Sequence, residues 1–196
     1  DGDISLEFRK KSASAVFAMT ASYESAISNY FIKDEDSLPK SINLNLNKSA
    51  NLRYGENPHQ DAAFYLPIGE IESWHQHQGK TLSYNNYADM ESAFNIPQEF
   101  SETACAIIKH ANPCGFGLGE NPKAAYLRAV TTDPVSYFGG IVGFNCEVDD
   151  ETAEELIQPF LECIIAPSFS SGALEILKKK KNLRVISVGE KGLVDN

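Results

Sequence analysis

The chain has 196 residues, of which 42% are hydrophobic and 22% are charged, proportions that are ordinary for a globular protein able to bury a core. Its 27 acidic and 17 basic residues give a formal net charge of -10, which argues against broad electrostatic binding of nucleic acid. No apolar run reaches the length of a membrane span and no basic-then-apolar segment opens the chain, so we expect a cytoplasmic protein without membrane contacts.

The first expected element is a helix over residues 6–31, a segment rich in Ala and free of Pro and Gly whose apolar residues can share one face. Over residues 32–52 the pattern gives way to acidic and polar stretches, which are typical of a linker or an extended connection. We therefore expect a boundary near residue 40, with the last helices of one domain in residues 1–40 and a second domain in residues 41–196. The chain lacks an initiator Met and a closing element, so we expect an internal piece of a longer protein.

Further along the chain, short β-branched runs alternate with helical patterns. The expected strands cover residues 104–109, 140–144, 162–166 and 183–188, and the expected helices cover residues 122–131, 151–158 and 171–180. Such alternation favours an α/β layer fold with a mostly parallel sheet. Asp149 or Asp150 is expected to cap the second of these helices, and Pro159 to end it.

The densest cluster of polar residues follows the first of these strands, where Lys109 and His110 lead into Asn112-Pro113-Cys114-Gly115. Ligands gather at the carboxyl ends of strands in open α/β sheets. A neighbouring ammonium disfavours a charged imidazole, which leaves His110 able to accept a proton, and Lys109 can stabilise developing negative charge. The alternative is that Lys109 only ends the strand and His110 only caps a turn. We expect residues 112–115 to form a tight turn, and Asn121-Pro122 to open a helix whose N-terminus can face an anion.

Two further clusters and one carboxylate are candidates for substrate contacts. Arg53 and Tyr54 lie in a polar loop, where a guanidinium suits phosphate or carboxylate and a phenol can stack on a flat ring. Phe138 and Gly139 lie in a turn that suits a wall for a heterocycle and close approach of a ligand. Glu162 stands at the start of an expected strand. Each has an ordinary alternative as a solvated arginine, a plain turn or an exposed carboxylate.

Other features have simpler interpretations. The four cysteines are widely spaced without a CxxC pair, so we expect buried free thiols rather than a zinc site or a disulfide framework. His75 and His77, with His59 upstream, are weak evidence for a metal site and are expected to be surface histidines. The run of residues 178–181, all Lys, is expected to complement a helix dipole at a solvated face.

Several motifs resemble signatures of the AICAR transformylase/IMP cyclohydrolase family. They are Leu-Arg-Tyr-Gly-Glu-Asn-Pro-His-Gln at 52–60, Ser-Tyr-Asn-Asn-Tyr-Ala-Asp at 83–89, Lys-His-Ala-Asn-Pro-Cys-Gly at 109–115, Tyr-Phe-Gly-Gly at 137–140 and Ile-Ile-Ala-Pro at 164–167. Their order and spacing match, so the resemblance covers nearly the whole chain. It implies that residues 1–40 end a cyclohydrolase domain and that residues 41–196 form the first of two transformylase halves, each a cytidine-deaminase-like three-layer αβα sandwich.

The resemblance also implies a reaction, the transfer of a formyl group from 10-formyltetrahydrofolate to the 5-amino group of AICAR, with IMP cyclohydrolase activity in the full-length protein. It implies His110 as the general base and Lys109 as the group that stabilises the transition state. The implied substrate contacts are Arg53, Tyr54, Asn86, Phe138, Gly139 and Glu162. No metal is implied. The full-length protein is expected to be a homodimer with a shared active site, and this chain alone is expected to be inactive or nearly so.

Two other functions are alternatives on the sequence, and the first of them fails because its metal ligands are missing. A zinc-dependent deaminase needs His-x-Glu and a later Pro-Cys-x-x-Cys, whereas His110 is followed by Ala111-Asn112 and Cys114 has no second thiol two residues on. A non-catalytic nucleotide-binding or assembly module would use the same Arg-Tyr loop and glycine turn, and would bind without turnover.

Overall fold

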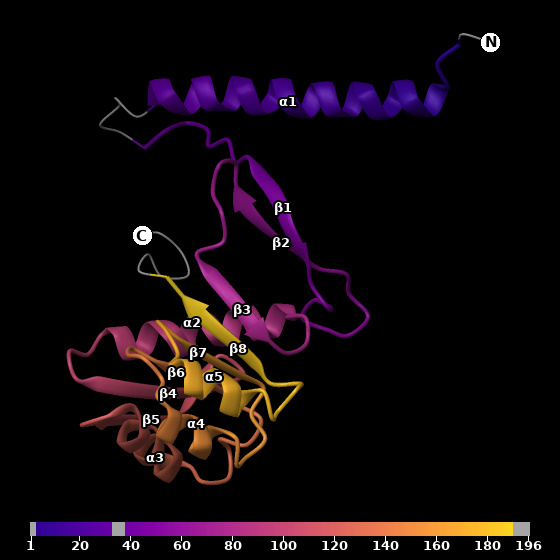
Figure 1. The fold of residues 1–196 in the computed structure, drawn as a ribbon. Helices are drawn as coiled ribbons and strands as arrows, with labels where there is room; N and C mark the ends of the chain where they lie inside the picture. Colours follow the sequence, from indigo (N-terminus) through magenta and orange to yellow (C-terminus); the bar gives the residue numbers. More distant parts are fainter. Residues whose placement is uncertain (1–2, 33–37, 190–196) are drawn as a thin grey trace. The chain divides into compact units, whose positions relative to one another are not determined.

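The structure is a computed structural model that describes residues 3–32 and 38–189 (Figure 1). The chain divides into two compact units, one formed by residues 1–49 and 65–70 and the other by residues 50–64 and 71–196. Each unit is described by itself.

The first unit contains the long helix α1 (Leu6–Ile32), which confirms the helix expected from the sequence. The side-chain amide of Asn29, near the end of α1, donates a hydrogen bond to the backbone oxygen of Asn43 at 3.3 Å. Within the segment expected to be a linker, the structure has the strand β1 (Leu46–Asn51), which pairs with β2 (Ala63–Pro67) in a two-stranded sheet. The polar sequence of β1 hid this strand, because almost all of its side chains are exposed and show no apolar alternation.

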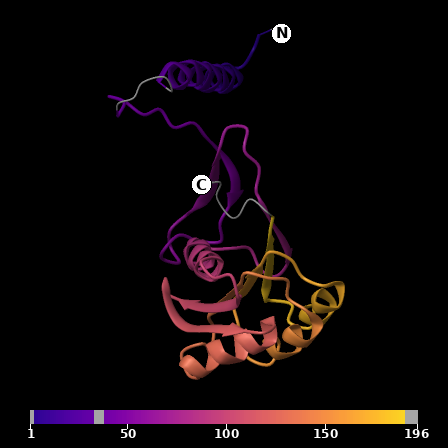
Figure 2. The same ribbon diagram turned by 90° about the vertical axis from the view of Figure 1, so that its left-hand side faces the viewer.

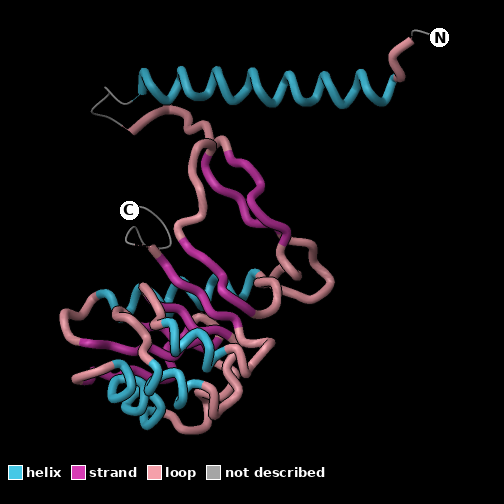
Figure 3. Tube along the Cα trace, in the orientation of Figure 1, coloured by secondary structure: helices cyan, strands magenta, loops and turns pink. Residues whose placement is uncertain are grey.

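In the described part of the second unit, six strands form one sheet in the order β3-β8-β7-β6-β4-β5. Figure 3 distinguishes the strands, in magenta, from the helices, in cyan. They are β3 (Trp74–Gln78), β4 (Thr103–Lys109), β5 (Asn112–Gly119), β6 (Ile141–Phe144), β7 (Cys163–Ala166) and β8 (Arg184–Val188). The expected strands and their order along the chain are confirmed for β4, β6, β7 and β8.

The expectation of a mostly parallel sheet is wrong, because the sheet is mixed. The pairs β6-β7 and β7-β8 are parallel, whereas β3-β8, β4-β5 and β4-β6 are antiparallel. The physical reason lies in the connection between β4 and β5, since two residues can join only antiparallel neighbours and a parallel pair needs a long crossover.

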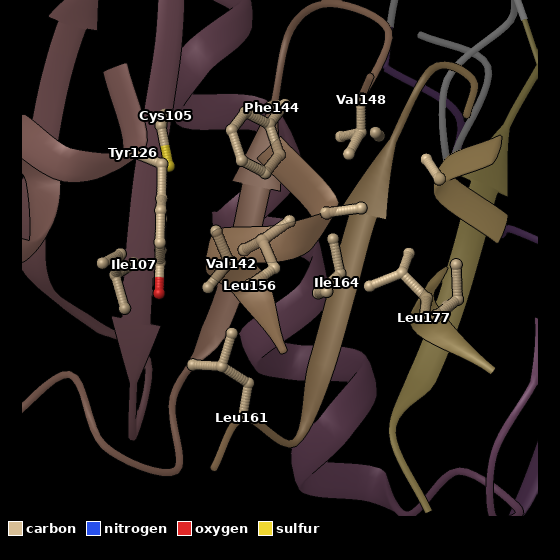
Figure 4. Packing of buried hydrophobic residues seen from close by; sticks show 14 of the residues in the cluster. Cys105, Ile107, Tyr126, Val142, Phe144, Val148, Leu156, Leu161, Ile164 and Leu177 are labelled. Atoms are coloured by element: carbon tan, nitrogen blue, oxygen red, sulfur yellow. The ribbon is translucent and has the colours of Figure 1, made fainter. Parts of the chain in front are cut away.

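Helices cover both faces of this sheet (Figure 2). They are α2 (Tyr84–Gln98), α3 (Pro122–Thr132), α4 (Asp150–Leu156) and α5 (Ser171–Leu177). On one face, Met90 and Phe94 of α2 are buried with residues of the strands. On the other, α3, α4 and α5 share a core with alternate strand residues, and Figure 4 shows Val142 and Ile164 beside Leu156 of α4. The unit is therefore an α/β layer structure.

Local capping follows the sequence closely. The Asn121 side chain accepts a hydrogen bond from the Ala124 amide at 2.8 Å and begins α3, and the Asp149 side chain does the same for the Thr152 amide and begins α4. The helix α4 ends before Pro159, as expected. The sequence predicts these helix ends because a capping side chain bonds the backbone amide only three residues further along the chain.

The strand β5 was not expected, because residues 112–115 predicted a tight turn. The turn lies two residues earlier, at His110-Ala111, and β5 begins directly after it. A Cβ atom on Gly115 or Gly117 would lie 2.4 Å from a backbone oxygen of α3, so these glycines let the helix backbone pack directly on the strand. Glycine is a poor strand former, which explains why the local pattern did not reveal β5.

Candidate functional site

The turn between β4 and β5 has a strained backbone. Lys109 pairs with Asn112 across the two strands, so His110 and Ala111 form a two-residue hairpin turn. Both have positive φ angles, 56° at His110 and 60° at Ala111. Hairpin turns with this geometry favour Asn and Gly, and the left-handed conformation costs other residues roughly 1–2 kcal/mol each. Such strain persists only where surrounding contacts hold it, and it is common at functional sites.

Two side chains hold this turn. The Asp89 carboxylate, on α2, accepts a hydrogen bond from the Ala111 amide at 2.6 Å. The Asn112 side chain donates a hydrogen bond to the His110 backbone oxygen at 2.9 Å. The His110 side chain itself is exposed, and within residues 3–32 and 38–189 no hydrogen bond engages its ring. The backbone of the turn is therefore fixed while the imidazole faces solvent.

Lys109 connects the hairpin to the glycine turn. Its ammonium donates a hydrogen bond to the Phe138 backbone oxygen at 2.9 Å. The next residue, Gly139, has a φ of 74°, and its amide donates to the Phe160 backbone oxygen at 2.8 Å. The rings of Phe138 and Phe160 lie 5.4 Å apart, and both are about half exposed. Two motifs that the sequence singled out separately are therefore neighbours in the structure.

Glu162 lies next to this turn and belongs to a polar network. Its amide donates to the Gly140 backbone oxygen at 3.1 Å. Its Oε2 atom accepts a hydrogen bond from the Asn86 side chain at 3.1 Å and lies 3.5 Å from the Arg184 guanidinium. Arg184 is only 5% exposed and also donates to the backbone oxygens of Lys80 and Thr81. The structure thus brings Asn86 and Glu162 together and fixes one oxygen of the carboxylate.

The Arg53-Tyr54 loop is attached to the N-terminus of α2. The Arg53 amide donates to the Leu82 backbone oxygen at 2.9 Å, and the Tyr84 amide donates to the Tyr54 backbone oxygen at 3.1 Å. The Arg53 guanidinium lies 5.4 Å from the centre of the Tyr54 ring. Because α2 also carries Asn86 and Asp89, the start of this helix contacts the loop, the Glu162 network and the strained hairpin.

Comparison with known proteins gives the family. A family model described as the AICARFT/IMPCHase bienzyme matches residues 1–195. The chain belongs to this family. It is 50% identical over 192 residues to the bifunctional purine biosynthesis protein PurH of Fusobacterium nucleatum, with 96% of this chain and 38% of the relative covered. It is also 46% identical over 189 residues to PurH of Clostridium botulinum strain Eklund 17B, with 95% and 38% covered.

The chain therefore spans about 38% of the length of these PurH relatives. Among solved structures, RibD of Acinetobacter baumannii in form 2 is similar with a TM-score of 0.40 and 13% identity, over 57% of this chain and 35% of that one. In form 1 the same protein gives a TM-score of 0.38 and 16% identity, over 50% and 31% of the two chains.

Asp89 and Arg184 make contacts within the candidate site, although neither was among the candidate residues identified from the sequence. Asp89 closes the motif at 83–89, but its partner Ala111 is 22 residues away, and Arg184 is 22 residues from Glu162. In the sequence, Asp89 is marked only by its place in a motif, and Arg184 only by its place at the start of an expected strand. Neither position predicts the distant residue that the side chain contacts.

The two histidines of β3 are exposed, as expected. The rings of His75 and His77 lie 4.7 Å apart, and His77 Nε2 lies 2.9 Å from the Ser187 hydroxyl. Burial, with a smaller contribution from His75, lowers the pKa of His77. Among the described residues, no group of three or more His, Cys, Asp or Glu side chains is arranged to hold a metal ion.

No helix in residues 3–32 or 38–189 combines the length and the apolar character that a membrane crossing requires, and the cytoplasmic location stays a prediction.

A surface cavity of about 330 Å³ lies beside the end of α4. It is lined by Leu156, Pro159, Phe160, Leu161 and residues 179–183. Of these, Phe160 contacts the candidate site, so the cavity adjoins the Phe138 turn without including the Lys-His pair.

Proposed function

We propose that this chain supplies part of the site that transfers a formyl group from 10-formyltetrahydrofolate to the 5-amino group of AICAR. The observation that carries the proposal is the hydrogen bond from Lys109 to the Phe138 backbone oxygen, which brings two family motifs together where β4 ends and β6 begins. Residues 1–40 would end the cyclohydrolase domain, and residues 41–196 would form the first transformylase half. IMP cyclohydrolase activity would belong to the full-length protein.

The chemistry needs a base because the amino group of AICAR is a poor nucleophile, being conjugated through the imidazole to a carboxamide. His110 takes the proton of this amine as its nitrogen bonds to the formyl carbon. The bond between the formyl carbon and N10 of the folate then breaks, and N10 takes up a proton as tetrahydrofolate leaves. Lys109 stabilises the negative charge that develops on the formyl oxygen. An ammonium has three N–H donors, and the Phe138 carbonyl engages one of them, which leaves two for this charge.

The other residues would bind the nucleotide. Arg53 suits the phosphate, Tyr54 and Phe138 offer aromatic surface to the heterocycle, and the Gly139 backbone permits close approach. In the described chain the contacts from Asn86 and Arg184 both end on Oε2 of Glu162, so Oε1 is left to accept a hydrogen bond from the substrate. Asn86 contributes by holding this carboxylate through its side-chain amide, and it is itself only 5% exposed.

We propose that the formyl donor is a co-substrate and that the reaction needs no metal. The full-length protein would be a homodimer whose site combines residues of both copies, so the isolated 196-residue chain would have little or no activity. The chain spans about 38% of its PurH relatives, which supports testing the site in a full-length context.

The experiment uses a full-length chimera in which this chain replaces the matching segment of the Fusobacterium nucleatum relative. Formyl transfer is measured for the unmodified chimera, Lys109→Ala, His110→Ala and the exposed-histidine control His75→Ala. We expect kcat to fall at least about 100-fold in Lys109→Ala and in His110→Ala, and to stay within about twofold of the unmodified chimera in His75→Ala. Cyclohydrolase activity serves as an internal check on folding.

Unchanged formyl transfer in both Lys109→Ala and His110→Ala would eliminate this mechanism. Binding of AICAR without turnover by the unmodified chimera would instead support a nucleotide-binding or assembly module.

A further inference from the structure

We propose that Asp89 is a positioning residue that holds the peptide bond after His110 in the orientation the reaction needs, an inference that rests on the proposed role of His110 as the base. Asp89 lies on α2, beside the fully buried Met90. Its Oδ1 atom accepts the Ala111 amide hydrogen bond at 2.6 Å. The acceptor is thus carried by a helix packed on the sheet, so it is placed more rigidly than a loop residue would be.

One peptide group is held at both ends. The carbonyl of His110 and the amide of Ala111 belong to the same peptide plane, and the carbonyl accepts from the Asn112 side chain while the amide donates to Asp89. If this peptide plane flips over, ψ of His110 and φ of Ala111 change, and the hairpin turn becomes a turn of another type. A flip breaks both hydrogen bonds, so the two side chains together lock the plane.

The lock is needed because the turn residues do not favour their own conformation. His110 and Ala111 both have positive φ angles without being glycine, and such backbone persists only where contacts outweigh the strain. A carboxylate is a strong acceptor for an amide because the hydrogen bond is charge-assisted. Asp89 therefore lies outside the hairpin and makes a contact that offsets the backbone strain at Ala111 and at His110, the proposed general base.

The effect on catalysis follows from geometry. The His110 ring is exposed and has no hydrogen bond of its own within the described residues, so its direction depends on its backbone. A misplacement of a catalytic group by about 1 Å can lower a rate on the order of 100-fold. Asp89 is expected to influence kcat through His110 without contacting the substrate.

The test uses the same full-length chimera with Asp89→Ala, Asp89→Asn and the control Glu91→Ala, which removes an exposed carboxylate of the same helix. In Asp89→Ala we expect kcat to fall about tenfold or more while KM for AICAR changes less than about threefold. Asp89→Asn keeps an acceptor oxygen and should retain most of the activity. Glu91→Ala should match the unmodified protein.

A second substitution can show whether Asp89→Ala lowers kcat through the turn or through a general loss of structure. Glycine adopts a positive φ without strain, so adding Ala111→Gly to Asp89→Ala should restore most of the lost kcat. Hydrogen exchange gives a readout independent of activity, because the Ala111 amide should exchange faster in Asp89→Ala and remain slow in Glu91→Ala.

The outcomes distinguish the two proposals. If His110→Ala is fully active, the proposed role of His110 as the base is wrong and this inference falls with it. If His110→Ala is impaired but Asp89→Ala has normal kcat and normal Ala111 exchange, only the role of Asp89 is overturned. An impaired Asp89→Ala that Ala111→Gly does not rescue also overturns it, because the loss then does not pass through the turn.

Discussion

The side-chain amide of Asn86 ties the beginning of α2 to the carboxylate of Glu162. Its Nδ2 atom donates to Glu162 Oε2 at 3.1 Å, while its Oδ1 atom accepts hydrogen bonds from the amide and the hydroxyl of Ser83, both at 3.0 Å. Ser83 caps the helix, so one side chain both completes the cap and orients a proposed substrate contact. The helix start and the site therefore depend on the same residue.

Asn86→Asp should separate these two tasks. The substitution keeps an oxygen for the cap but removes the donor and sets a second carboxylate against Glu162. We expect the free energy of unfolding, measured with urea at pH 7, to fall by about 1–3 kcal/mol. Adding Glu162→Gln supplies a donor but also weakens the pair with Arg184, so it should recover only part of this loss. Equal stability of the single and double variants would contradict the direct contact, and Ser83→Ala, which affects only the cap, should cost about 1 kcal/mol.

Arg184→Met should be strongly destabilising. It removes the buried guanidinium that pairs with Glu162 and donates to the backbone oxygens of Lys80 and Thr81. Breaking a buried pair costs about 3–5 kcal/mol, although the partial exposure of Glu162 places this site toward the lower end. Lys178→Met, which breaks the exposed pair with Glu175, is the control and should change stability by less than about 1 kcal/mol. Similar urea midpoints for the two variants would refute a structural role of Arg184.

Gly117→Ala tests the close packing of α3 on β5. The added Cβ would lie 2.4 Å from the Ala125 backbone oxygen and 2.7 Å from the Ala129 amide nitrogen, so helix and strand must move apart. We expect a loss of about 1–3 kcal/mol in unfolding free energy. Gly189→Ala is the comparison variant, because its Cβ would meet the Ser73 backbone oxygen at 3.2 Å, a tight contact that a small shift relieves, so its loss of stability should be smaller. A thermal midpoint unchanged by Gly117→Ala would show that the packing is looser than described.

Cys146 should react with iodoacetamide only at high pH. Burial, followed by the charges of Asp149 and Glu147, raises the pKa of its thiol to about 11 against the opposing effect of a hydrogen bond with Thr103. The thiolate is the reactive form, so a raised pKa means slow alkylation at pH 8 that accelerates about tenfold per pH unit toward pH 11. Peptide mass mapping measures this rate, and Cys146→Ser should abolish the signal. A plateau below pH 9 would show an ordinary exposed thiol.

The strands β4, β6, β7 and β8 and the helices α1, α3, α4 and α5 could be predicted from the sequence because each has its own apolar pattern or cap. The strand β5 could not, since its glycines are explained only by the helix that packs on them. The mostly parallel sheet was predicted wrongly for a different reason. The direction of β5 depends on a two-residue turn that the sequence placed at residues 112–115, and the antiparallel pairs β3-β8 and β4-β6 join strands that are not consecutive in the sequence.

For the candidate site, the sequence by itself determined the residue types, their order and the family, because motifs and caps depend on neighbours a few positions apart. It marked Lys109 and His110 at a strand end and Phe138 at a glycine turn. Only the tertiary structure decided which of these residues meet. The hydrogen bond between Asn86 and Glu162 joins residues 76 positions apart, and the one between the Ala111 amide and Asp89 joins residues 22 positions apart. Such contacts follow from the packing of α2 against the sheet, which no local pattern encodes.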